Sequence, residues 1–155
     1  MRIGIIVHSV SGKTKSIAEM LKDRAPDSYS VTVEEVKPTS DWKTGDKNVN
    51  LEVSPAIDGY DVLIIGAPIM AFSIDPVMKT YLTGIDSFNN KKIAVFATKS
   101  LPFYWTGGYQ GLGKMSKICK EKNGIILVEK IIHNKKKIDE ETFDEFAGSI
   151  YSLIR

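Results

Sequence analysis

The chain has 155 residues, of which 43% are hydrophobic and 26% are charged, and its formal net charge is +2 at pH 7. These values predict one globular domain over residues 1–155, and so small a positive charge does not favour nucleic acid as a partner. The longest apolar run, Val62–Phe72, is too short to cross a membrane, and the single cysteine, Cys119, excludes an internal disulfide and a thiolate metal site, which favours a cytoplasmic protein.

The first half of the chain alternates between strand and helix patterns. A β-branched run predicts a strand over Arg2–His8, and apolar residues three and four positions apart predict an amphipathic helix over 13–25. Alternation predicts a half-exposed strand over Tyr29–Val36, and the polar stretch 37–58 predicts a long loop with at most a short helix. The segment Asp61–Ala67 is apolar at almost every position, which is typical of a strand buried on both faces.

The second half continues the same alternation. Its predicted elements are a helix from Asp75-Pro76, a strand over Lys92–Thr98, a helix after Gly107 and Gly108, a strand over Ile125–Ile132 and a helix over 139–154. An acid followed by proline is a typical helix start, and Asn123-Gly124 is a typical helix end. The pattern predicts a three-layer α/β fold, in which a doubly wound, five-stranded parallel sheet carries helices on both faces.

Binding residues are expected at one edge of this sheet. Doubly wound sheets bind their ligands beyond the carboxyl ends of the strands, near the point where the strand order reverses. The segments that follow the first, third and fourth predicted strands are Ser9–Thr14, Pro68–Ser73 and Lys99–Gly108. These three loops are the candidate binding loops.

The first loop has the features of a phosphate site. Three hydroxyl residues and a glycine lie in Ser9–Thr14, where a helix begins, and helix N-termini and hydroxyls both donate to anions. It is not the loop of nucleoside triphosphatases, because Val7 stands where that motif needs a glycine, and the dinucleotide fingerprint G-x-G-x-x-G is also absent. The alternative is that Ser11 or Gly12 only caps the helix.

Two segments resemble the flavodoxin family. HSVSGKTKSIAE, residues 8–19, resembles the family's FMN phosphate loop, which has the form S/T-x-T/S-G-x-T. DGYDVLIIGAPIMAFSIDPVMKTYL, residues 58–82, is similar to the family's third strand, flavin-flanking loop and following helix. With the other elements the resemblance covers essentially the whole chain, and it implies FMN as cofactor and five parallel strands ordered 2-1-3-4-5.

The resemblance also implies a set of FMN-binding residues. Those around the phosphate would be Ser9, Ser11, Gly12, Lys13 and Thr14. Those flanking the flavin ring would be Pro68, Ile69, Met70, Ala71 and Phe72, with Phe72 as the main flanking group. Those of the third loop would be Thr98, Lys99, Ser100, Gly107 and Gly108. No metal site is expected, and the sequence does not identify which residue, if any, does acid–base work.

Three features separate the chain from the electron-carrier flavodoxins. Those proteins usually flank the ring with Trp and Tyr, are strongly acidic and often carry asparagine where Lys13 stands, whereas this chain offers Met70 and Phe72 and is slightly basic. The expected function is therefore electron transfer or FMN-dependent oxidoreduction, with a redox partner protein or a small-molecule donor or acceptor such as NAD(P)H or a quinone. The alternative is an interaction or regulatory module without flavin.

The sequence leaves the roles of a few residues open. Tyr104, Trp105 and Tyr109 could stack on a flavin, line a substrate site or pack on the helix behind them. His8 is more typical of a strand end than of a catalyst, although an orienting role beside the phosphate loop is open. Cys119 lies on the apolar stripe of its helix and is expected to be an unreactive core thiol.

Overall fold

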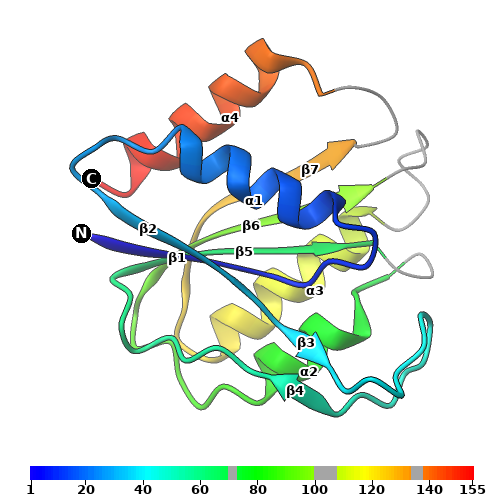
Figure 1. The fold of residues 1–155 in the computed structure, drawn as a ribbon. Coiled ribbons are helices and arrows are strands. Elements are labelled where there is room, and N and C mark those ends of the chain that lie inside the picture. The colour runs from blue at the N-terminus through cyan, green and yellow to red at the C-terminus, as the bar shows by residue number, and fades with distance from the viewer. Residues whose placement is uncertain (70–72, 100–107, 134–137) are drawn as a thin grey trace.

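The structure is a computed structural model that describes residues 1–69, 73–99, 108–133 and 138–155. These residues form a five-stranded parallel sheet in the order β2-β1-β5-β6-β7 (Figure 1). The strands are β1 (Arg2–Val7), β2 (Ser30–Glu35), β5 (Val62–Pro68), β6 (Lys92–Lys99) and β7 (Ile125–His133). The predicted fold class and the strand order 2-1-3-4-5 are confirmed.

Two pairs of helices cover the two faces of the sheet (Figure 1). One face carries α1 (Lys13–Asp23) and α4 (Glu140–Leu153), and the other carries α2 (Pro76–Thr83) and α3 (Gly108–Glu121). No helix in the described ranges combines the length and the apolar composition that crossing a membrane requires.

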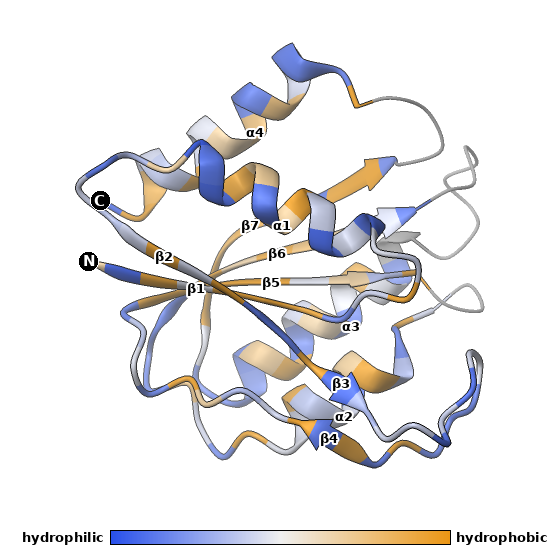
Figure 2. Ribbon diagram, in the orientation of Figure 1, coloured by the Kyte–Doolittle hydropathy of each residue, from blue (hydrophilic) through white to orange (hydrophobic). Residues whose placement is uncertain are grey.

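The sheet divides the apolar side chains into two cores. Successive residues of a strand point to opposite faces, so Ile3 and Ile5 pack under α1 and α4 while Leu63 and Ile65 pack under α2 and α3. Figure 2 shows the corresponding apolar colouring of the central strands. Because both faces are covered, the inner strands are apolar without interruption, which is the pattern that predicted them.

The crossover from β2 to β5 differs from the prediction. Residues 37–58 contain no helix, and two short strands, β3 (Lys37–Pro38) and β4 (Leu51–Val53), pair antiparallel in a small second sheet. The physical reason is that Leu51 packs against the core under α2 and α3, which brings the two extended segments together so that their backbone groups can pair. The crossover therefore lies along the α2 side of the molecule (Figure 1).

The helix ends agree with their predicted caps. The Asp75 carboxylate accepts hydrogen bonds from the N–H groups of Val77 and Met78, both 3.2 Å long, and Asp139 accepts one from Thr142. Asn123 has φ +66°, and the next N–H closes the end of α3 on the carbonyl oxygen of Cys119. Burial raises the pKa of the Cys119 thiol to about 12, as expected for an unreactive core cysteine.

We expect the stability of the protein to fall in alkali because of Tyr151. This residue of α4 is buried, and its hydroxyl donates a hydrogen bond of 2.6 Å to the carbonyl oxygen of Leu21 on α1. Burial raises the pKa of the phenol to about 12. Between the ordinary pKa of about 10 and the raised one, the unfolded chain loses this proton and the folded chain keeps it, so the free energy of unfolding falls by about 1.4 kcal/mol per pH unit.

Denaturant titrations of the wild type and of Tyr151→Phe measure this effect. At neutral pH the variant should be less stable by about 1 kcal/mol, because one buried hydrogen bond is lost. The difference should stay constant up to about pH 9, shrink above about pH 10 and reverse sign before about pH 12, because only the wild type has the tyrosine whose ionisation favours the unfolded chain. A difference that does not change over that range would contradict the assignment.

Candidate functional site

The loop between β1 and α1 forms an open N-terminal helix end. Gly12 has φ +88°, a left-handed conformation that favours glycine, and its carbonyl oxygen accepts from the N–H of Ser16 at 3.0 Å. The Ser9 hydroxyl accepts from the N–H of Lys15 at 3.3 Å. Within the described residues the N–H groups of Lys13 and Thr14 donate no hydrogen bond, as is normal for the first turn of a helix. Two backbone donors and the positive end of the helix dipole are therefore available to an anion.

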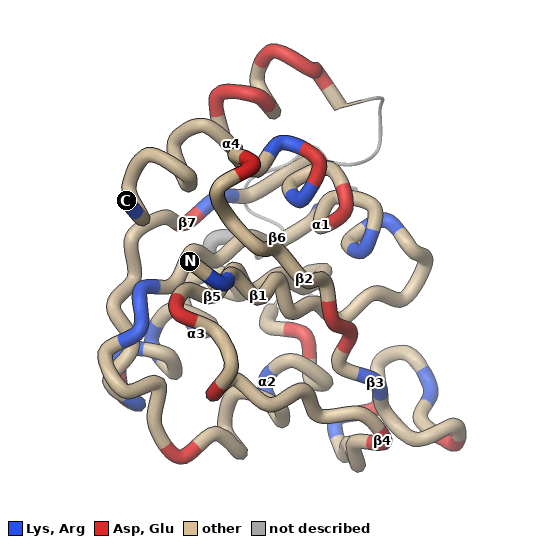
Figure 3. The backbone as a smooth tube through the Cα atoms, turned by 60° about the vertical axis from the view of Figure 1, so that its left-hand side comes forward, with Lys and Arg blue, Asp and Glu red and all other residues tan. Residues whose placement is uncertain are grey.

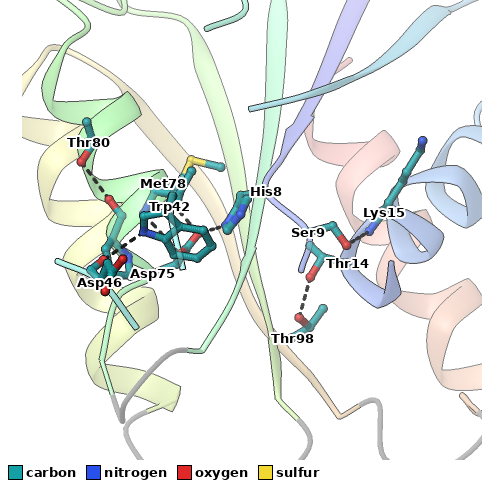
Figure 4. A network of polar contacts seen from close by, with 12 residues as sticks. His8, Ser9, Thr14, Lys15, Trp42, Asp46, Asp75, Met78, Thr80 and Thr98 are labelled. Atoms are coloured by element: carbon teal, nitrogen blue, oxygen red, sulfur yellow. Dashed lines mark hydrogen bonds and ion pairs between the residues drawn. The ribbon is translucent and has the colours of Figure 1, made fainter. Parts of the chain in front are cut away.

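A buried hydroxyl pair joins this loop to the end of β6. The hydroxyl oxygens of Thr14 and Thr98 are 2.8 Å apart, and both side chains are 2% exposed. The N–H of Ile69 donates to the carbonyl oxygen of Thr98 at 2.9 Å, so the segment after β5 joins the same edge. Figure 4 shows the contact between Thr14 and Thr98, and with the Ile69 bond the first and second predicted loops meet at the end of β6.

These segments enclose a small cavity of about 120 Å³. Its lining residues are Val10, Ser11, Lys13, Thr14, Pro68, Ile69 and Thr98. A water molecule needs only about 10–15 Å³ on this measure, so the cavity has room for a group several times larger. Hydroxyls and a lysine line it, and none of its described lining residues is acidic. Its chemistry is that of a site for one phosphate group.

The second loop can approach α3 closely because of a glycine. A Cβ atom on Gly111 would lie 2.9 Å from the carbonyl oxygen of Ser73 and 3.1 Å from Cδ1 of Ile69. These distances are shorter than side-chain carbons tolerate, so a larger residue would push α3 away from the loop. Gly111 was not predicted as a site residue, because its role depends on the packing of α3 against the loop.

The other predicted site residues are placed as follows. Ser9 bonds the first turn of α1, and Gly108 is the first residue of α3. Thr98 and Lys99 are the last two residues of β6, which ends one position beyond the predicted strand end at Thr98. The Lys99 side chain is only 4% exposed. The predictions for Met70, Ala71, Phe72, Ser100 and Gly107, and for the aromatic residues Tyr104 and Trp105, lie outside the described residues, as does the side chain of Tyr109.

A buried histidine–aspartate pair beside the cavity loops was not predicted. Nδ1 of His8, the first residue after β1, contacts Oδ2 of Asp75, and the side chains are 3% and 0% exposed. Trp42 of the crossover packs on the His8 ring edge to face, with 5.6 Å between ring centroids (Figure 4). Asp75 thus joins the end of β1 to the start of α2, although its position in the sequence indicated only the start of α2.

Comparisons with known proteins identify the fold. No known family model matches the sequence, and no curated protein matches it at a significant level. Among solved structures, oxidised flavodoxin 1 from Bacillus cereus has a TM-score of 0.71 at 16% identity, and the match covers 100% of both chains.

Two further solved structures contain a flavin. A flavoprotein from Lactobacillus acidophilus in complex with FMN has a TM-score of 0.63 at 18% identity and covers 84% of this chain and 92% of that one. General stress protein 14 from Treponema denticola, also in complex with FMN, has a TM-score of 0.67 at 15% identity and covers 100% of both chains. The chain therefore has the flavodoxin-like fold.

Proposed function

We propose that this chain binds FMN at the edge formed by its three loops and uses it in electron transfer or FMN-dependent oxidoreduction. The observation that carries the proposal is the cavity at the N-terminus of α1, with its hydroxyl and N–H donors. It lies at the carboxyl edge of the sheet, where doubly wound folds bind ligands. The FMN complexes among the structural neighbours support the same cofactor.

The residues of the first loop would hold the phosphate. The N–H groups of Lys13 and Thr14 and the exposed hydroxyl of Ser11 would donate to its oxygens, and the ammonium of Lys13 would balance part of its charge. The Thr14 hydroxyl would keep the loop in register with β6 through Thr98. This donor set fits a phosphate dianion without a buried arginine.

The segment after β5 would flank the ring. Pro68 and Ile69 also line the cavity, and the proposal extends this wall to residues 70–72. The third loop, from Thr98 and Lys99 through Ser100 to Gly107 and Gly108, would cover the other side of the site. When bound, FMN supplies one-electron and two-electron redox chemistry, and the chain would orient it and limit its contact with water.

The experiment that tests this function is reconstitution. The purified chain is mixed with FMN, and absorbance in the blue and quenching of flavin fluorescence report binding. The loaded protein is then assayed for oxidation of NADH and NADPH with a panel of quinones, and for reduction by a flavodoxin reductase. Turnover without a partner protein would indicate an enzyme, and reduction only by the reductase would indicate an electron carrier. Failure to bind FMN would contradict the proposal and favour the alternative of an interaction or regulatory module without flavin.

We expect Ser11→Ala to weaken FMN binding without changing riboflavin binding. The Ser11 hydroxyl is exposed at the cavity and has no internal hydrogen bond among the described residues, so its removal disturbs only the ligand. A lost hydrogen bond to a charged group costs about 1.5–3 kcal/mol, which raises the Kd about tenfold to a hundredfold. Fluorescence quenching titrations with FMN and riboflavin measure both constants.

The matched control is Ser16→Ala on the same helix. Ser16 is exposed on α1 and does not line the cavity, so its substitution should leave both constants unchanged. If Ser11→Ala lowered the affinities for FMN and riboflavin equally, the assignment of the phosphate site to this loop would be wrong.

A further inference from the structure

A second, larger cavity lies over the outer face of α2. It is a groove of about 700 Å³, within the range of about 300–1,000 Å³ that is usual for small-molecule sites. Residues from the crossover, from α2 and the segment before it, and from α3 line it: Gly45, Lys47, Ser73, Ile74, Pro76, Lys79, Thr80, Thr83, Gly84 and Lys114. None of these residues lines the cavity at the start of α1.

The groove is positively charged. Lysines and acids are interspersed over the described part of the chain (Figure 3), but the described residues that line the groove include three lysines and no acid. Within the described residues Lys47, Lys79 and Lys114 form no ion pair, and Nζ of Lys114 donates to the Ser73 hydroxyl at 2.9 Å. The three ammonium groups come from separate parts of the fold, and an anion in the groove would offset their mutual repulsion.

The floor of the groove is apolar. Ile74 is 8% exposed, and Pro76 begins α2 beside it. Thr80 and Thr83 continue the lining along the outer face of the helix. An inorganic anion would leave this floor uncovered, whereas an organic anion would cover it with its apolar body.

The wall that carries Lys47 is held in shape by its own hydrogen bonds. Nε1 of Trp42 donates to the carbonyl oxygen of Asp46 at 3.0 Å, and the N–H of Lys43 donates to the Asp46 carboxylate at 3.0 Å. Gly45 makes the turn with φ +97°. Trp42 in turn packs on the buried His8 ring. The wall is therefore organised before any ligand binds, which lowers the entropy cost of binding.

We infer that this groove binds a small organic anion, with an apolar body and a carboxylate, sulfonate or phosphate group, at a site separate from the proposed FMN site. The lysines bind the charged group, and Ile74 and Pro76 contact the apolar body. The inference goes beyond the proposed function and does not depend on it, because it rests only on the groove.

Anilinonaphthalene sulfonate is a suitable probe, and N-phenylnaphthylamine is its neutral analogue without the sulfonate. Isothermal titration calorimetry of the purified full chain should detect one site for the sulfonate and much weaker binding of the neutral compound. Each of Lys79→Gln and Lys114→Gln should raise the Kd of the sulfonate about twofold to fivefold, and the double variant about tenfold, as for exposed charge pairs. Raising the salt concentration should weaken binding of the wild type.

The matched control is Lys117→Gln on the same helix as Lys114. Nζ of Lys117 lies 4.0 Å from a carboxylate oxygen of Glu121, and the residue does not line the groove, so the Kd should not change. Saturating the chain with FMN should also leave sulfonate binding unchanged. Equal affinity for the neutral analogue, an unchanged Kd in the double variant, an equal effect of Lys117→Gln, or competition by FMN would each overturn the inference.

Discussion

Asp75→Ala should lower the free energy of unfolding by about 3–5 kcal/mol, because it removes the shared acceptor of three buried hydrogen-bond donors, and each donor left without a partner costs about 1–3 kcal/mol. The carboxylate is 0% exposed and accepts from His8 and from the N–H groups of Val77 and Met78. Alanine would leave all three donors buried without an acceptor. Urea titrations followed by circular dichroism measure the loss.

A second helix-capping aspartate provides the matched control. Asp139 caps α4 by accepting from Thr142, but it is exposed and has no buried partner. Asp139→Ala should therefore cost only about 1 kcal/mol, the usual value of an N-cap. The difference between the two losses in free energy of unfolding measures how much the burial of Asp75 and its contact with His8 add to the stability given by a helix cap alone.

A double-mutant cycle separates the His8 contact from the cap itself. His8→Ala and Asp75→Ala should combine less than additively, because the His8–Asp75 contact is lost in either single variant and can be lost only once in the double variant. If the two losses add, or if Asp75→Ala costs no more than Asp139→Ala, the pair does not stabilise the fold. The pair matters for the candidate site because His8 directly precedes the first loop, Ser9–Thr14, and Asp75 connects it to α2. Trp42, which packs on His8, belongs to the wall of the groove over α2.

Gly66→Ala should lower the free energy of unfolding by about 2–3 kcal/mol, since it overpacks the centre of the sheet. Gly66 of β5 lies opposite Phe96 of β6, and a Cβ atom there would lie 2.1 Å from Cζ of the Phe96 ring. The ring is 0% exposed, so it has no space into which to move. The same urea titrations measure this loss.

Gly148→Ala on α4 is the control for replacing a glycine. No atom lies within 4 Å of the added Cβ, and alanine favours a helix, so this variant should gain up to about 1 kcal/mol. Adding Phe96→Leu to Gly66→Ala should restore part of the stability by making room. The close approach of Gly66 and Phe96 would be refuted if Gly66→Ala were as stable as the wild type.

Features that depend on neighbouring residues could be predicted from the sequence. Periodicity of the apolar residues predicted the five strands of the large sheet and the four described helices, and the acids at Asp75 and Asp139 predicted two helix starts. The loop Ser9–Thr14 was recognised because its hydroxyls, its glycine and the following helix are adjacent in the chain. Such patterns reflect local geometry, which a few neighbouring residues determine.

Features that depend on distant residues could only be seen in the tertiary structure. The His8–Asp75 pair joins residues 67 positions apart, and the Thr14–Thr98 pair joins residues 84 apart. The small β3-β4 sheet replaced the expected loop, and the groove collects lysines from three separate segments. None of these features can be recognised from neighbouring residues in the sequence. Each depends on segments that are far apart in the chain and become neighbours only through the order of the strands and the packing of the helices on the sheet.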